Sequence, residues 1–109
     1  MRAVLTGDII NSREHEGWQQ ELVAILDQYG TSPQDWEIYR GDSFQLEVDA
    51  AKALKVAIHI KAVVKMRAEL DVRIAIGIGN KTYTAAQITQ ANGSAFIHSG
   101  TAFDAIKKN

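Results

Sequence analysis

The chain has 109 residues, the usual size of one domain, and 46% of them are hydrophobic, which is enough to form a buried core. The formal net charge of −1 argues against a protein that binds nucleic acid or an anionic membrane through bulk charge. There are no cysteines, which excludes disulfides and thiolate metal sites and favours a cytoplasmic location. Lysines interrupt the longest apolar stretch, 50–66, and argue against a membrane span.

The first half of the chain predicts a strand, a helix and a β-hairpin. Residues 2–9 form a short, mostly apolar run that ends at turn-forming residues, as strands do. Apolar residues recur at helical spacing from Trp18 to Tyr29, which predicts a helix. Residues 36–40 and 44–48 alternate between apolar and polar, and the tight connection Gly41-Asp42-Ser43 between them predicts a hairpin.

The second half predicts a helix, a strand and a helical tail. Asp49 stands at the N-cap position of a helix that is expected to reach about Glu69. Residues 72–79 alternate apolar with smaller residues, which predicts a strand with one apolar face and one bare face. The bare face could admit a nucleobase or a partner subunit, or lie under a packed helix. Residues 83–91 fit a short strand, a helix or both, and residues 94–108 predict a helix.

This order of elements predicts an α+β fold of the ferredoxin-like βαββαβ type, with an antiparallel sheet of strand order 4-1-3-2. The two intervening helices are expected on one face of the sheet, and the tail adds a C-terminal helical extension. Because the third strand runs antiparallel to the first, the hairpin turn should lie beside the end of the first strand. Asp8 and Asp42, which are far apart in sequence, therefore meet at one edge of the sheet.

Two neighbouring carboxylates repel each other unless a cation neutralises them, and oxygen ligands favour Mg²⁺ or Mn²⁺. The loop after Asp8 leads towards a helix, whose free backbone N–H groups could hold a phosphate. Arg40 and Arg73 lie at the same edge and could contact that phosphate, or face solvent. Asp8 and Asp42 thus predict a metal–phosphate site for a nucleotide or other phosphorylated small molecule. The alternative is that both aspartates only form local turns and caps.

Four segments, taken in order and at their observed distances, carry a family resemblance. They read TGDIINS (6–12), YRGDSFQ (39–45), RIAIGIG (73–79) and NGSAF (92–96). Together they resemble the SatD family and, more distantly, the palm domains of class III nucleotidyl cyclases and GGDEF diguanylate cyclases.

The resemblance implies a single palm-like domain over 1–109. In such palms the metal ligands correspond to Asp8, Asp42 and the backbone carbonyl of Ile9. The backbone amides that would face a triphosphate correspond to Ile10, Asn11 and Ser12.

The chain also departs from the cyclase pattern. Asn11-Ser12 stands where cyclases carry Gly-Phe, and residues 95–99 lack the asparagine and arginine of the cyclase late helix. Ser43 stands where diguanylate cyclases need an acid. The resemblance therefore implies metal-dependent nucleotide binding in a regulatory role without cyclase activity, with a homodimer as one expected assembly.

Two alternatives stay open: a non-catalytic dimerisation or sensor module of a transcriptional regulator, and a weakly active cyclase. SatD-like proteins are longer, so residues 1–109 are expected to be either an N-terminal domain of a longer regulator or a short natural version. Direct nucleic-acid binding by this domain is not expected.

Overall fold

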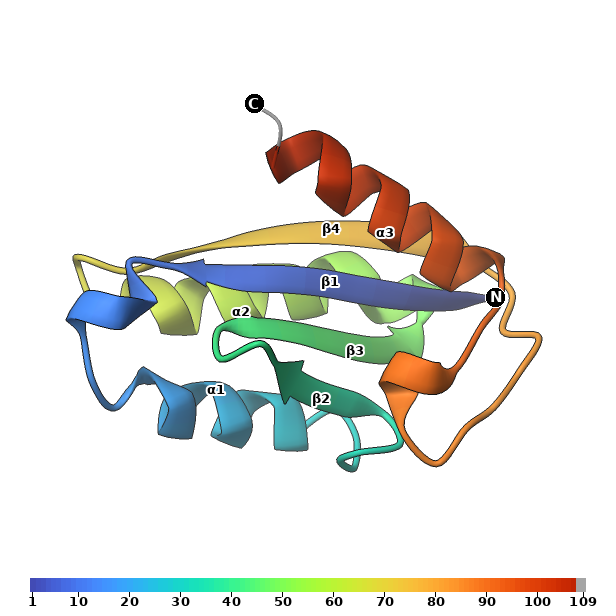
Figure 1. Ribbon diagram of the computed structural model, residues 1–109, viewed down its shortest axis with the longest axis horizontal. Helices are drawn as coiled ribbons and strands as arrows, with labels where there is room; N and C mark the ends of the chain where they lie inside the picture. The colour runs from blue at the N-terminus through green and yellow to red at the C-terminus, as the bar shows by residue number, and fades with distance from the viewer. Residues whose placement is uncertain (108–109) are drawn as a thin grey trace.

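An antiparallel sheet forms the centre of the molecule, for which the computed structural model describes residues 1–107 (Figure 1). Within that part the strands are β1 (Arg2–Ile10), β2 (Trp36–Tyr39), β3 (Ser43–Asp49) and β4 (Asp71–Gly79). Their spatial order is β2-β3-β1-β4, and each neighbouring pair is antiparallel. The predicted α+β fold and strand order 4-1-3-2 are confirmed.

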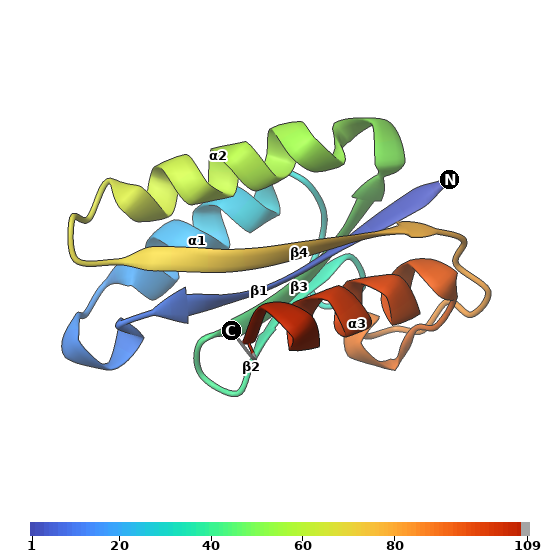
Figure 2. The same ribbon diagram turned by 90° about the horizontal axis from the view of Figure 1, so that it is seen from above.

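Helices cover both faces of this sheet (Figure 2). Helices α1 (Trp18–Asp27) and α2 (Ala53–Lys65) lie on one face, and α3 (Ser94–Lys107) lies on the other, which we call the α3 face. The described residues also form the short 3₁₀ turns η1 (Ser12–Glu14), η2 (Ala50–Lys52) and η3 (Ile88–Gln90). Within residues 1–107, no helix combines the length and the apolar character needed to cross a membrane.

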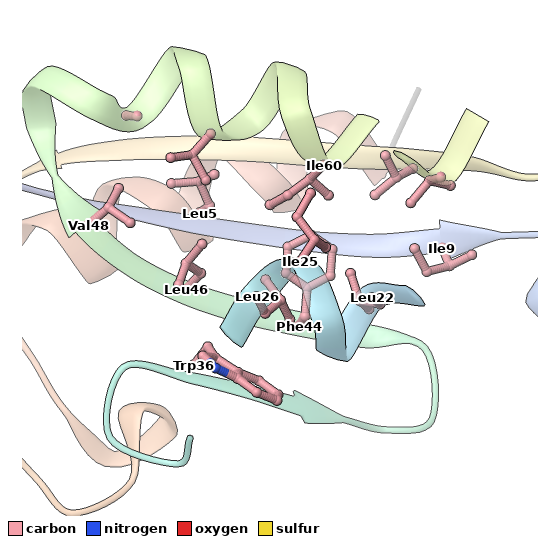
Figure 3. Packing of buried hydrophobic residues seen from close by; sticks show 14 of the residues in the cluster. Leu5, Ile9, Leu22, Ile25, Leu26, Trp36, Phe44, Leu46, Val48 and Ile60 are labelled. Carbon is pink, nitrogen blue, oxygen red and sulfur yellow. The ribbon is translucent and has the colours of Figure 1, made fainter. Parts of the chain in front are cut away.

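The main core lies between the sheet and the pair α1 and α2 (Figure 3). Leu5 on β1 and Phe44 and Leu46 on β3 point to this side and are fully buried. They pack with Leu22 of α1 and Ile60 of α2. Each such side chain contributes about 1.5–3 kcal/mol on burial, so the packing of this layer stabilises the sheet.

The bare strip of β4 lies under α3. A Cβ atom on Gly77 would stand 2.1 Å from the backbone nitrogen of Ser99, so only glycine lets the helix approach this closely. Next to this contact the Ser99 hydroxyl shares a 2.6 Å buried hydrogen bond with the hydroxyl of Thr6 on β1. Of the occupants that the sequence left open for this strip, the structure selects the packed helix.

Three local predictions need correction or completion. Asp49 stands at the N-cap position of η2, which leads into α2, but its side chain makes no capping hydrogen bond and pairs with Arg2 instead. The helix then ends at Lys65 rather than near Glu69. The stretch 83–91 holds η3 and one end of an isolated bridge between Tyr83 and Asn92. The predicted last residue of the tail, residue 108, lies outside the described residues.

Candidate functional site

The end of β1 and the β2–β3 turn lie side by side (Figure 1). Asp8 and Ser43 are directly opposed across β1 and β3, and the backbone N–H of Ile9 donates to the carbonyl of Asp42 at 2.9 Å. A hollow of about 470 Å³ opens at this corner of the sheet. Its lining consists of Asp8, Ile9, Ile10, Asn11, Ser12, Arg13, Asp42 and Arg73. The topology thus brings both predicted aspartates to one hollow.

Asp8 is held by an arginine on the neighbouring strand. The register places Arg73 of β4 directly opposite Asp8, on the α3 face. Arg73 donates from Nε to Oδ1 at 3.0 Å and from Nη2 to Oδ2 at 2.8 Å, the forked geometry of a strong charge-assisted pair. These hydrogen bonds, together with attraction from the charges of Asp8 and Asp42, raise the pKa of the Arg73 guanidinium. The Asp8 side chain is only 10% exposed, whereas that of Arg73 is 37% exposed.

Asp42 is more open to solvent than Asp8 and has a different partner. Its turn contains two consecutive residues with positive φ, Arg40 at 55° and Gly41 at 85°, a tight form that suits a hairpin. The Ser12 hydroxyl donates to Asp42 Oδ2 at 3.2 Å, which ties the loop after β1 to the hairpin. The Asp42 carboxylate therefore keeps free acceptor capacity that faces the hollow.

The loop after β1 consists of a left-handed turn and a short 3₁₀ helix. Ile10 still lies in β1 opposite Asp71, and Asn11 turns the chain with a positive φ of 67°. The Asn11 side chain donates to the carbonyl of Glu69 at 3.0 Å, so its role is to fix the loop. The chain then makes only the short turn η1, and α1 begins at Trp18. The predicted helix does follow this loop, but η1 and residues 15–17 separate the two. Phosphate binding by the backbone amides of Ile10, Asn11 and Ser12 stays a prediction.

The arginines divide between two hollows. Arg73 lines the hollow of Asp8 and Asp42, whereas Arg40 lines an adjacent hollow that shares Asp42. The Arg40 guanidinium lies 6.0 Å from the ring centroid of Tyr39. Arg13, which sequence reasoning missed, lines both hollows. Its position directly after the predicted loop was the signal that could have identified it. The cations that line the first hollow are therefore Arg73 and Arg13.

The donor set suits a metal ion that arrives with its ligand better than a resident one. Asp8, Asp42 and the carbonyl of Ile9 offer hard oxygen donors, which suits Mg²⁺ or Mn²⁺. Among the described residues, no group of three or more His, Cys, Asp or Glu side chains could hold a metal. Mg²⁺ often keeps several waters and uses one or two carboxylates plus substrate phosphates, so this set fits a Mg²⁺–phosphate complex.

Neither the models of known protein families nor the curated protein sequences match this chain. The resemblance to the SatD family and to cyclase palms therefore stays a prediction that rests on four sequence segments.

Proposed function

We propose that the hollow at Asp8 and Asp42 binds a nucleotide or another phosphorylated small molecule together with Mg²⁺ or Mn²⁺, and that the domain is a regulatory ligand-binding module without cyclase activity. One observation carries this proposal. A nearly buried carboxylate, Asp8, is neutralised by Arg73 at the wall of an open hollow that a second carboxylate, Asp42, also lines. A purely structural ion pair has no need of that second carboxylate or of the open space.

Arg73 is the residue that would respond to the ligand. A guanidinium binds phosphate with the same planar fork with which it binds a carboxylate. Because the Arg73 side chain is 37% exposed, it can exchange Asp8 for a phosphate in the hollow at modest cost. The oxygens of Asp8, Asp42 and Ile9 are those that would hold the ion, which when bound supplies positive charge to the phosphate. Arg13 and the loop at Ser12 would then bound the ligand on its outer side.

Thermal unfolding with Mg²⁺ and ATP, GTP or tripolyphosphate tests this proposal. A ligand present at about 100 times its Kd should add roughly 2.7 kcal/mol to the free energy of unfolding. Asp42→Asn should abolish the Mg²⁺-dependent part of that stabilisation. Asp27→Asn, which changes an exposed aspartate on α1, is the matched control and should keep it. Equal stabilisation of both variants, or none in the wild-type protein, would contradict the proposal.

We expect no cyclic nucleotide product. Cyclisation requires positioned donors for the charge that develops in the transition state, and the loss of one such donor typically costs ~10²–10³ in rate. Residues 95–99 carry no asparagine or arginine. Incubation with Mn²⁺ and ATP or GTP, followed by chromatography, should therefore give only background. Cyclic product that disappears in Asp8→Asn would make the domain an enzyme.

A second candidate function, homodimerisation, has its own observation. β4 is an edge strand in the described part of the chain, and an apolar hollow of about 420 Å³ runs along it. Leu54 and Ile58 of α2 line this hollow and are 67% and 61% exposed, so the edge is open and apolar. Antiparallel pairing of two β4 edges would place the charged end, with Asp71 and Arg73, beside the neutral end of the partner strand.

Light scattering coupled to size-exclusion chromatography tests this second candidate over a range of protein concentrations. The wild-type chain should show a concentration-dependent dimer, and Ile58→Glu should give a monomer with unchanged helical content. Val23→Glu, at an exposed apolar position on α1, is the control and should leave the dimer intact. A wild-type monomer at all concentrations would remove this candidate.

A further inference from the structure

We infer that a further hollow on the α3 face, which we call the ring hollow, receives a planar hydrogen-bonding ring of the same ligand. The ligand would then be a nucleotide rather than a simple phosphate. This inference rests on the proposed function and names the other half of its ligand. The hollow has a volume of about 200 Å³ and lies between the β2–β3 hairpin and the C-terminal half of α3. A cavity of about 150 Å³ already admits one aromatic ring. Its lining includes Thr6, Tyr39, Ser43, Gln45, Gly100 and Phe103.

The floor of this hollow carries polar side chains that the fold does not use. Tyr39, Ser43 and Gln45 take part in no side-chain hydrogen bond within residues 1–107, and no buried side-chain polar atom there lacks a partner. Their polar atoms are therefore accessible to solvent and free to bind a ligand in the hollow that these residues line. The Gln45 amide offers one acceptor and two donors, the combination that reads the edge of an adenine in other complexes. A purely phosphorylated ligand would leave these groups without a role.

The wall formed by α3 contains a glycine that packing does not require. A Cβ atom on Gly77 would collide with α3, but a Cβ atom on Gly100 would meet nothing within 4 Å. Glycine inside a helix is destabilising relative to alanine. Gly100 therefore weakens α3, although no neighbouring atom requires a glycine at this position. What it does provide is free space over the hollow. Phe103, one turn further along α3, adds an apolar surface against which a ring can lie.

The rim of the hollow is cationic and suits an anionic ligand. Arg40 lies 6.0 Å from the ring centroid of Tyr39, and Lys107 lies 5.4 Å from that of Phe103. Asp104 is the acid that also lines this hollow. Two cations against one acid leave a net positive rim, which complements a ligand that carries phosphates.

The two hollows adjoin on the same face of the sheet. Ser43 lines the ring hollow, and Asp8 lines the hollow proposed for the metal and phosphate. The two residues are direct cross-strand neighbours. Thr6 and Asp8 are alternate residues on one face of β1, and such residues lie about 7 Å apart along a strand. A single nucleotide can therefore place its phosphates beside Asp8 and its ring beside Gln45.

Binding of ATP, GTP and tripolyphosphate, each with Mg²⁺, tests the inference by isothermal titration calorimetry. The wild-type protein should bind one of the nucleotides at least tenfold more tightly than tripolyphosphate, which lacks the ring. Gly100→Leu fills the hollow from the helix and should remove that difference while it leaves tripolyphosphate binding unchanged. Thr101→Leu, which adds the same side chain at an exposed position of α3 outside the hollow, is the matched control and should keep the difference. Gln45→Met preserves size, removes the amide, and should weaken the nucleotide alone by about tenfold.

Each pattern of results decides between the two proposals. If tripolyphosphate binds and the nucleotides bind no tighter, or if Gly100→Leu has no effect, the ring site is refuted and the metal–phosphate site stands. If nucleotides bind without Mg²⁺ dependence, tripolyphosphate does not bind, and Gly100→Leu abolishes nucleotide binding, the ring site stands and the proposed function fails. Absence of binding by all three probes refutes both. Circular dichroism of each variant should show that α3 is retained.

Discussion

The pair formed by Asp8 and Arg73 allows a quantitative test of the site by a double-mutant cycle. Arg73→Met leaves the Asp8 carboxylate nearly buried, without its partner and beside Asp42. Hydrogen bonds to charged groups contribute about 1.5–3 kcal/mol, and breaking a fully buried pair costs ~3–5 kcal/mol. The Arg73 side chain is 37% exposed, so water screens the pair and the lower range applies. We expect Arg73→Met to lose about 2 kcal/mol at pH 7.

Asp8→Asn should lose less, about 1 kcal/mol, because the amide oxygen still accepts from Arg73 and the exposed guanidinium can turn to water. The double variant should resemble Asp8→Asn alone, since it no longer buries an unpartnered charge. The coupling energy of the cycle is then roughly 2 kcal/mol, well above the ~0.3–0.5 kcal/mol of independent sites. Urea unfolding followed by far-UV circular dichroism measures all four proteins.

Additive losses within about 0.5 kcal/mol would refute this reasoning, because they would mean that Asp8 and Arg73 do not interact. The same proteins also test the metal. If Asp8 and Asp42 can share an ion, Mg²⁺ should restore part of the stability lost in Arg73→Met and none of that lost in the double variant. Equal recovery of both proteins would indicate a general salt effect.

The remaining predictions concern α3 and the ion pair of β4. Gly77→Ala should lose about 1–3 kcal/mol of unfolding free energy, because the new methyl group collides with the backbone of Ser99, and thermal unfolding should show the loss. Gly100→Ala should instead gain about 0.5–1 kcal/mol in the same assay, and a loss there would show that this glycine is packed. The hydrogen bond from Lys61, strongest of several causes, lowers the pKa of Asp71 below its ordinary 3.8. The stabilisation of the folded protein by the Lys61–Asp71 ion pair is therefore complete above that pH and is lost as the pH falls below it. Lys61→Met should cost at most ~1 kcal/mol at pH 7. Its stability should approach that of the wild-type protein as the pH falls below 3.8; a gap that does not narrow in acid urea titrations would exclude this pair as the cause.

The local prediction of strands succeeded where the side-chain alternation was strong. The run 72–79 and the hairpin 36–48 show a period of two, which only a strand can place with its apolar residues on one face. The connection order then required an antiparallel third strand beside the first, and this requirement brought Asp8 and Asp42 to one hollow. That part of the site followed from topology without any knowledge of contacts.

The partner of Asp8 could not be predicted in the same way. Whether Arg73 faces solvent, a phosphate or Asp8 depends on the register of β1 against β4, and a slip of one residue would move it to the other face. The role of Asp49 also depended on a tertiary contact, since Arg2 of the neighbouring strand pairs with the carboxylate that would otherwise cap a helix.

By itself, the sequence determined the α+β class, the strand order and the convergence of the two aspartates, because periodicity and chain connectivity are local or topological properties. Only the tertiary structure decided that α3 lies on the strip at Gly77, that Arg73 neutralises Asp8, and that Gly100 leaves a hollow beside Gln45. The physical reason is the same in each case. Small side chains and exposed charges are compatible with several neighbours, and the packing of distant elements selects one of them.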